Sequence, residues 1–182
     1  DFQTYLVLGF EHIADLAGYD HILFICALCA VFQPSDWKKV LIQITAFTIG
    51  HSITLMLSVT NTFTINSQYI EILIPITILS TAIANFWNNS RLLSWKNYSM
   101  TIFFGFIHGM GFSYLLKMLL GKTSDIFMPL LAFNLGIEIG QIGIVSVFMF
   151  VTFFTSFMGL SHPKWKMIIS LLCILMSFFL LW

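Results

Sequence analysis

The sequence predicts an all-α integral membrane protein, a single domain of about six transmembrane helices spanning residues 1–182. Of the 182 residues, 58% are hydrophobic and only 9% are charged, and the mean hydropathy is +0.92. Soluble domains carry roughly 25% charged residues, so this chain cannot build a water-facing surface. Polar residues also divide it into apolar stretches of about 20 residues, the length at which a helix crosses a ~30 Å hydrocarbon core. Membrane lipid is therefore the expected surrounding, and a nucleic-acid partner, which needs a basic face, is excluded.

The predicted helices are separated by short segments rich in turn residues. The first, residues 5–32, is polar in its N-terminal half, and Gly18 favours a bend there. The others are residues 40–59, 70–87, 98–120, 127–157 and 165–182, with joints at residues 33–36, 61–68, 88–90, 121–125 and 161–163. The chain starts at Asp1 rather than Met, as expected if a preceding segment has been removed.

Basic residues predict how these helices are oriented. Pairs of Lys or Arg follow the first, third and fifth helices, namely Lys38 and Lys39, Arg91 and Lys96, and Lys164 and Lys166. Because cytoplasmic loops are enriched in Lys and Arg, we expect both termini outside the cytoplasm. The same predicted cytoplasmic helix ends carry aromatic residues suited to the membrane interface, which are Trp37, Trp87, Trp95 and Trp165.

Four ionisable residues share one predicted depth in the membrane. His21, His51, His108 and Glu138 come from four different helices, and each lies roughly 16–18 Å from a membrane face at 1.5 Å per residue. An ionisable side chain costs ~2.5–3.5 kcal/mol at that depth, so each needs a partner or a function. The shared depth predicts one shared site, whereas a lone intramembrane histidine is more typical of a hydrogen bond between helices.

The residue types at this site predict a metal ion. Three imidazoles with two carboxylates, Asp20 and Glu138, are the ligand set expected for a divalent transition-metal ion. Neighbouring polar side chains predicted to orient these ligands are Thr48, Ser52, Asn134 and Gln141. Toward the outer end of the first helix, Glu11, His12 and Asp15 are predicted to form an acidic mouth or to supply additional ligands. The alternative for Asp20 is a helix N-cap, and for Glu11 and Asp15 it is simple solvation.

Several segments carry a resemblance to a known family. These segments are GYDH (18–21), which follows His12, and TAFTIGHS (45–52), FGFIHGMGF (104–112) and FNLGIEIGQ (133–141). They resemble the hallmark segments of the HupE/UreJ family. The longer spacing from His12 to Asp20, and Glu138 one helix after His108, place the chain in a divergent branch. The resemblance implies a six-helix inner-membrane protein that acts as a nickel or cobalt permease beside hydrogenase and urease accessory proteins. It also implies that the His, Asp and Glu residues above are metal ligands.

Two functions follow from such a site. The first is a secondary permease, because the sequence contains no nucleotide-binding signature and metal binding can exchange for protons. The second is an intramembrane metal-dependent hydrolase, in which Glu138 activates a zinc-bound water to attack a lipid or a membrane-embedded substrate. A bis-His haem protein fits less well because of the accompanying carboxylates. A permease needs polar lining on both sides of the site, and on the cytoplasmic side the sequence offers few polar residues, among them Thr45 and Asn97.

Overall fold

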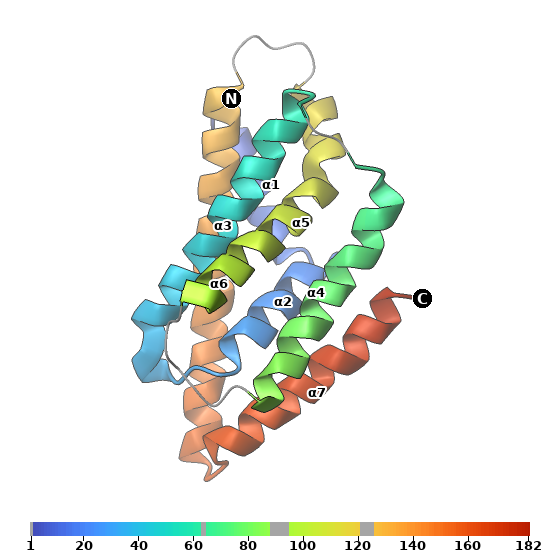
Figure 1. The fold of residues 1–182 in the computed structure, drawn as a ribbon. Helices are drawn as coiled ribbons and strands as arrows, with labels where there is room; N and C mark the ends of the chain where they lie inside the picture. Colours follow the sequence, from blue (N-terminus) through green and yellow to red (C-terminus); the bar gives the residue numbers. More distant parts are fainter. Residues whose placement is uncertain (1, 63–64, 88–94, 121–125) are drawn as a thin grey trace.

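The computed structural model describes residues 2–62, 65–87, 95–120 and 126–182, which are mainly helical (Figure 1). Its elements are α1 (Phe2–Ala14), α2 (Asp20–Cys29), the 3-10 helix η1 (Pro34–Asp36), α3 (Trp37–Val59), α4 (Ser67–Trp87), α5 (Trp95–Leu120), α6 (Phe127–Phe157) and α7 (His162–Leu180). Helices α3 to α7 are each long and apolar enough to cross a membrane. Their ends differ from the predicted ones by less than one turn, and the predicted all-α membrane bundle is confirmed. The predicted joints at residues 88–90 and 121–125 lie outside the described residues.

The first predicted helix is two helices rather than one bent helix. α1 ends at Ala14 and α2 begins at Asp20. Between them, Oδ1 of Asp15 accepts a hydrogen bond from the backbone N–H of Ala17 at 2.8 Å, and Oδ1 of Asp20 accepts one from the backbone N–H of His21 at 2.8 Å. Such local bonds compete with the helical ladder, and Gly18 adds further freedom. The sequence located the irregularity correctly but underestimated it, because the helix is interrupted over residues 15–19.

Two pairs of helices touch through glycine. In the α3–α5 pair, a Cβ atom added at Gly105 would collide with the carbonyl oxygen of Phe47, and one at Gly109 with the carbonyl oxygen of His51. In the α1–α6 pair, a Cβ atom added at Gly136 would collide with the carbonyl oxygen of Leu6. Small residues one turn apart let helix backbones approach closely in membranes. These contacts fix α3 against α5 and α1 against α6, so the side chains beside the glycines are held at defined positions.

The helix ends gather at two ends of the bundle. Figure 1 shows the start of α1 and the last residues of α3 and α5 at one end, which we call the upper end. The opposite end, which we call the lower end, contains the end of α4 and the turn between α6 and α7. The side chains of Trp37, Trp87 and Trp95, at the first or last residues of their helices, are largely exposed. That placement is typical of an aromatic belt at a membrane interface.

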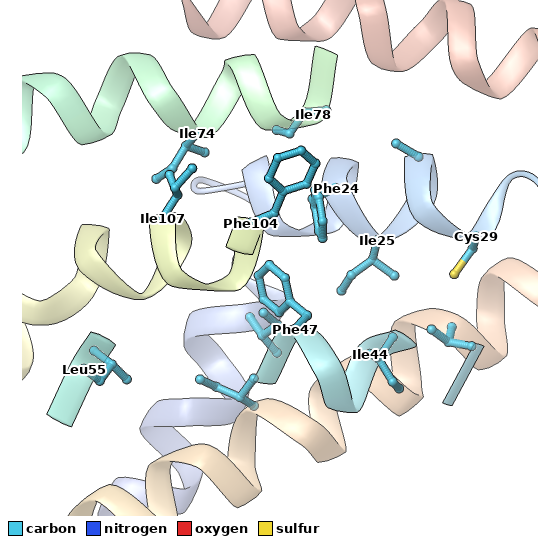
Figure 2. Packing of buried hydrophobic residues seen from close by; sticks show 14 of the residues in the cluster. Phe24, Ile25, Cys29, Ile44, Phe47, Leu55, Ile74, Ile78, Phe104 and Ile107 are labelled. Atoms are coloured by element: carbon cyan, nitrogen blue, oxygen red, sulfur yellow. The ribbon is translucent and has the colours of Figure 1, made fainter. Parts of the chain in front are cut away.

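The centre of the bundle is aromatic. Figure 2 shows Phe24 of α2, Phe47 of α3 and Phe104 of α5 meeting among buried isoleucines. Phe24 and Phe47 are each 1% exposed, and Phe104 is 9% exposed. Each of these phenylalanines stands one turn from a histidine on its own helix.

Candidate metal centre

Three histidines converge where α1, α2 and α3 meet. His12 lies in the last turn of α1, His21 in the first turn of α2 and His51 near the middle of α3. One ligand nitrogen from each lies within 4.8 Å of those of the other two. The interruption between α1 and α2 produces this convergence, because it lets the end of one helix and the start of the next face the same point.

A fourth histidine, His108 of α5, stands beside the three. Its ring centroid is 5.1 Å from that of His21, and its side chain is fully buried. The glycine contacts of α5 with α3 place it there, since Gly105 and Gly109 bracket it and both touch the backbone of α3. The His21 ring therefore has both the His51 and the His108 ring as neighbours, whereas the ligand nitrogens that gather within 4.8 Å are those of His12, His21 and His51.

Two of these imidazoles are oriented by a second group. Nδ1 of His21 lies 3.1 Å from Oδ1 of Asp20, and Nδ1 of His108 lies 3.0 Å from the carbonyl oxygen of Phe104. With its hydrogen on Nδ1, each imidazole donates to that oxygen and presents a lone pair on Nε2. Metal-binding histidines in proteins characteristically hold this arrangement.

Five other ring nitrogens of these histidines have no partner among the described residues. They are Nε2 of His12, His21 and His108 and both nitrogens of His51, and all five atoms are buried. Burying a polar group without a hydrogen bond costs about 1–3 kcal/mol, so five such atoms in one place need an explanation. Neutral imidazole nitrogens are good ligands for zinc, nickel, cobalt and copper. The residues present therefore fit a divalent transition-metal ion.

The two predicted carboxylate ligands take different positions. Asp20 adjoins the cluster and acts on His21 through Nδ1. Glu138 accepts a hydrogen bond from Oγ1 of Thr45 at 2.8 Å and lines a separate cavity of about 310 Å³ between α3 and α6. It is not among the residues whose ligand atoms gather within 4.8 Å.

The polar residues predicted to orient the ligands lie mainly around Glu138. Thr48, Ser52 and Asn134 line the same α3–α6 cavity. Oγ1 of Thr48 donates to Oε1 of Gln141 at 2.8 Å, Oγ of Ser52 donates to the carbonyl oxygen of Thr48, and Nδ2 of Asn134 donates to the carbonyl oxygen of Leu130. The Thr48–Gln141 bond joins α3 to α6, the other two lie within one helix, and none of the three involves Asp20 or a histidine.

Two cavities lead from the cluster toward the interruption in the first membrane segment. One, of about 260 Å³, is lined by His12, Asp15, Asp20, His21, Glu71 and His108, among others. The second, of about 620 Å³, is lined by Glu11, His12 and Asp15 with apolar neighbours that include Phe112. The predicted acidic mouth thus has a counterpart, in which His12 belongs to both the mouth and the cluster.

Sequence reasoning missed two contributors to this region. Glu71, in the first turns of α4, adds a third carboxylate to the smaller cavity beside Asp15 and Asp20. Its position near a helix end concealed it, because solvated carboxylates are common there. Phe112 packs on the His12 ring with centroids 4.0 Å apart, and it lies one turn beyond His108 on α5, a spacing visible in the sequence.

A comparison with protein families agrees with this geometry. The family description that matches reads "HupE / UreJ protein", and the match covers residues 1–182. The chain belongs to the HupE/UreJ family. Neither the curated proteins nor the solved structures gave a significant match. For this HupE/UreJ protein, membership implies a membrane protein related to metal transport, and the histidine cluster is the part of the described chain suited to hold the metal.

Proposed function

We propose that this HupE/UreJ protein is a secondary permease for a divalent transition-metal ion, bound in transit by His12, His21, His51 and His108. The observation that supports this most directly is the set of five buried imidazole nitrogens without a partner among the described residues. Nickel or cobalt is the cargo that the family resemblance suggests, and zinc is chemically compatible with the same ligands.

The mouth attracts the ion and the cluster replaces its water. Carboxylates of Asp15, Asp20 and Glu71 line the cavity that reaches His21 and His108, and a negative lining raises the local concentration of cations. At the cluster, imidazole nitrogens take the place of the hydration shell. Asp20, bonded to His21, supplies negative charge next to the ion without being required as a ligand.

The hydrolase hypothesis has less support from the geometry. It requires a general base within reach of a metal-bound water, and it assigns that role to Glu138. Glu138 instead faces Thr45 in the cavity between α3 and α6. The position of Glu138 therefore does not favour the general base that this hypothesis names.

The test is metal stoichiometry together with uptake. Purified protein is chelated, reloaded with Ni²⁺, Co²⁺ or Zn²⁺, and analysed for bound metal, and the same preparations are reconstituted into liposomes that contain a metal-sensitive dye. We expect His51→Gln to lose both binding and uptake. His162→Gln is the matched control, because His162 lies at the start of α7, away from the cluster, with Nε2 3.0 Å from the carbonyl oxygen of Phe32. Equal metal content in the two variants would refute the proposal.

A further inference from the structure

The histidine cluster rests on a layer of phenylalanine. Phe24 follows His21 by one turn on α2, Phe47 precedes His51 by one turn on α3, and Phe104 precedes His108 by one turn on α5. Since α2 runs opposite to α3 and α5, all three steps lead the same way, toward the lower end (Figure 1). The three rings therefore form a layer directly below the imidazoles.

The rings in this layer touch one another and the imidazoles above. The Phe24 and Phe47 centroids are 4.9 Å apart, and those of Phe24 and Phe104 are 6.0 Å apart. The His108 centroid lies 5.0 Å from that of Phe24 and 5.1 Å from that of Phe47. Figure 2 shows the three phenylalanines converging from three helices. The three phenyl side chains that make up this layer carry no polar atom that could bind a cation.

Below the phenylalanines, polar side chains line part of a mostly apolar cavity. This cavity of about 80 Å³ is bordered on one side by Phe104 and otherwise by residues that include Gln43, Thr81, Asn85, Asn97 and Thr101. Gln43 lies one turn below Phe47, and Thr101 lies one turn below Phe104. Oγ1 of Thr101 donates to Oε1 of Gln43 at 2.7 Å.

We propose that Phe24, Phe47 and Phe104 are the lower gate of the permeation route, and that the ion leaves past them into the cavity of Gln43, Asn85 and Thr101. This inference rests on the proposed permease function. Above the layer the cluster adjoins the carboxylate-lined cavity, so the structure represents the state that is closed toward the lower end. This cavity adds the side-chain oxygens of Gln43, Asn85 and Thr101 to Asn97, which the sequence had already indicated on this side.

The position of Phe24 links ion binding to the gate. Phe24 and His21 share α2, a helix of 10 residues that the interruption at residues 15–19 separates from α1. A shift of this short helix on metal binding moves the ligand and the gate residue together. Apolar constrictions close channels by excluding water, and the same physics applies to these three phenyl rings. When the rings turn, their faces can also attract a passing cation.

The experiment measures Ni²⁺ entry into liposomes that contain the reconstituted protein and an impermeant chelating dye. We expect Phe47→Ala and Phe104→Ala to raise the initial rate by about tenfold, which corresponds to a barrier lower by ~1.4 kcal/mol, with unchanged metal stoichiometry. The matched control is Phe148→Ala, because Phe148 is also a buried phenylalanine but lies on α6, with its ring 6.2 Å from that of Trp165. Phe47→Leu, which keeps an apolar side chain, covers failure of the alanine variants to fold and should give an intermediate rate.

Each outcome decides between the two proposals. If the alanine variants bind metal normally and admit Ni²⁺ at the wild-type rate, the gate is overturned and the permease proposal stands. If the alanine variants do not fold, a wild-type rate in Phe47→Leu leads to the same conclusion. An equal increase in Phe148→Ala would also overturn the gate, because general loosening of the bundle would then explain the flux. Entry in the alanine variants without entry in the wild type would refute both proposals, because the rings would then be a permanent seal rather than a gate. No entry in any folded variant would refute both.

Discussion

Replacing Asp20 by Asn tests how the cluster is held together. The change keeps the side-chain volume and one acceptor oxygen, but it removes the negative charge beside His21. In the structure Oδ1 of Asp20 lies 3.1 Å from Nδ1 of His21, and Nε2 of His21 is buried without a partner among the described residues. Asp20→Asn should therefore weaken metal binding without abolishing it.

The size of the effect follows from this contact. Loss of a group that orients a metal-binding histidine typically costs 10–100-fold in affinity. The Asp20 side chain is 22% exposed, so water can partly replace its charge, and asparagine still accepts a hydrogen bond. Both facts place the expected loss near the lower limit, about tenfold or ~1.4 kcal/mol.

The assay is a Ni²⁺ titration of purified protein against a competing chromophoric chelator at constant pH. Asp36→Asn is the matched control, because Asp36 pairs with Lys39 at 2.7 Å near the lower end and lies away from the cluster. Two results would refute the reasoning in opposite ways. An unchanged affinity would show that Asp20 does not act on His21, and a complete loss of bound metal would show that Asp20 is itself a ligand, as the sequence alone suggested.

Three further predictions concern other parts of the fold. Glu138→Gln should keep the metal stoichiometry of the wild type, because the Glu138 carboxylate faces Thr45 outside the cluster; loss of metal in this variant would restore Glu138 as a ligand. Gly109→Ala should lower the free energy of unfolding by about 1–3 kcal/mol, since its Cβ atom would meet the backbone of His51, whereas Gly143→Ala, with nothing within 4 Å of the added atom, should not; equal denaturation midpoints would contradict this. A cysteine placed at Gln68, at the start of α4, should react with an impermeant reagent from outside the cell, because the Lys and Arg pairs predict the joint at residues 61–68 to be external. Labelling from the cytoplasmic side alone would show that the predicted orientation of the protein is reversed.

Counting residues along the sequence predicted the depth of the site residues in the membrane better than the side of the helix on which each residue lies. Counting 1.5 Å per residue along apolar helices assigned His21, His51 and His108 to one level, and their rings do lie close together. The same count assigned Glu138 to that level. Depth does not determine which side of a helix faces which neighbour, and the glycine contacts that set the rotation of α6 against α1 are a property of the packed bundle. Glu138 consequently faces α3 at Thr45.

The place of His12 depended on an irregularity that counting does not capture. In a continuous helix, residues nine positions apart are separated by roughly 13 Å along the axis, which placed His12 in the mouth, above His21. The side-chain bonds of Asp15 and Asp20 to nearby backbone N–H groups interrupt that helix. As a result the ring centroids of His12 and His21 are 4.7 Å apart. The acidic residues thus shape the chain that forms the cluster in addition to lining its mouth.

The tightly packed α3–α5 pair buries two imidazoles, those of His51 and His108, that apolar packing alone would not favour. Gly105 and Gly109 press α5 against the backbone of α3, and this contact holds both His51 and His108 in the interior. Phe47 and Phe104 lie one turn away on the same helices, so one rigid interface positions the ligand layer and the apolar layer together. Two imidazoles without a partner for Nε2 oppose folding, while the buried rings below them favour it. This balance is consistent with the proposed permease, in which ion binding would recover the cost of the unpartnered nitrogens and the proposed gate would hold the ion until the helices move.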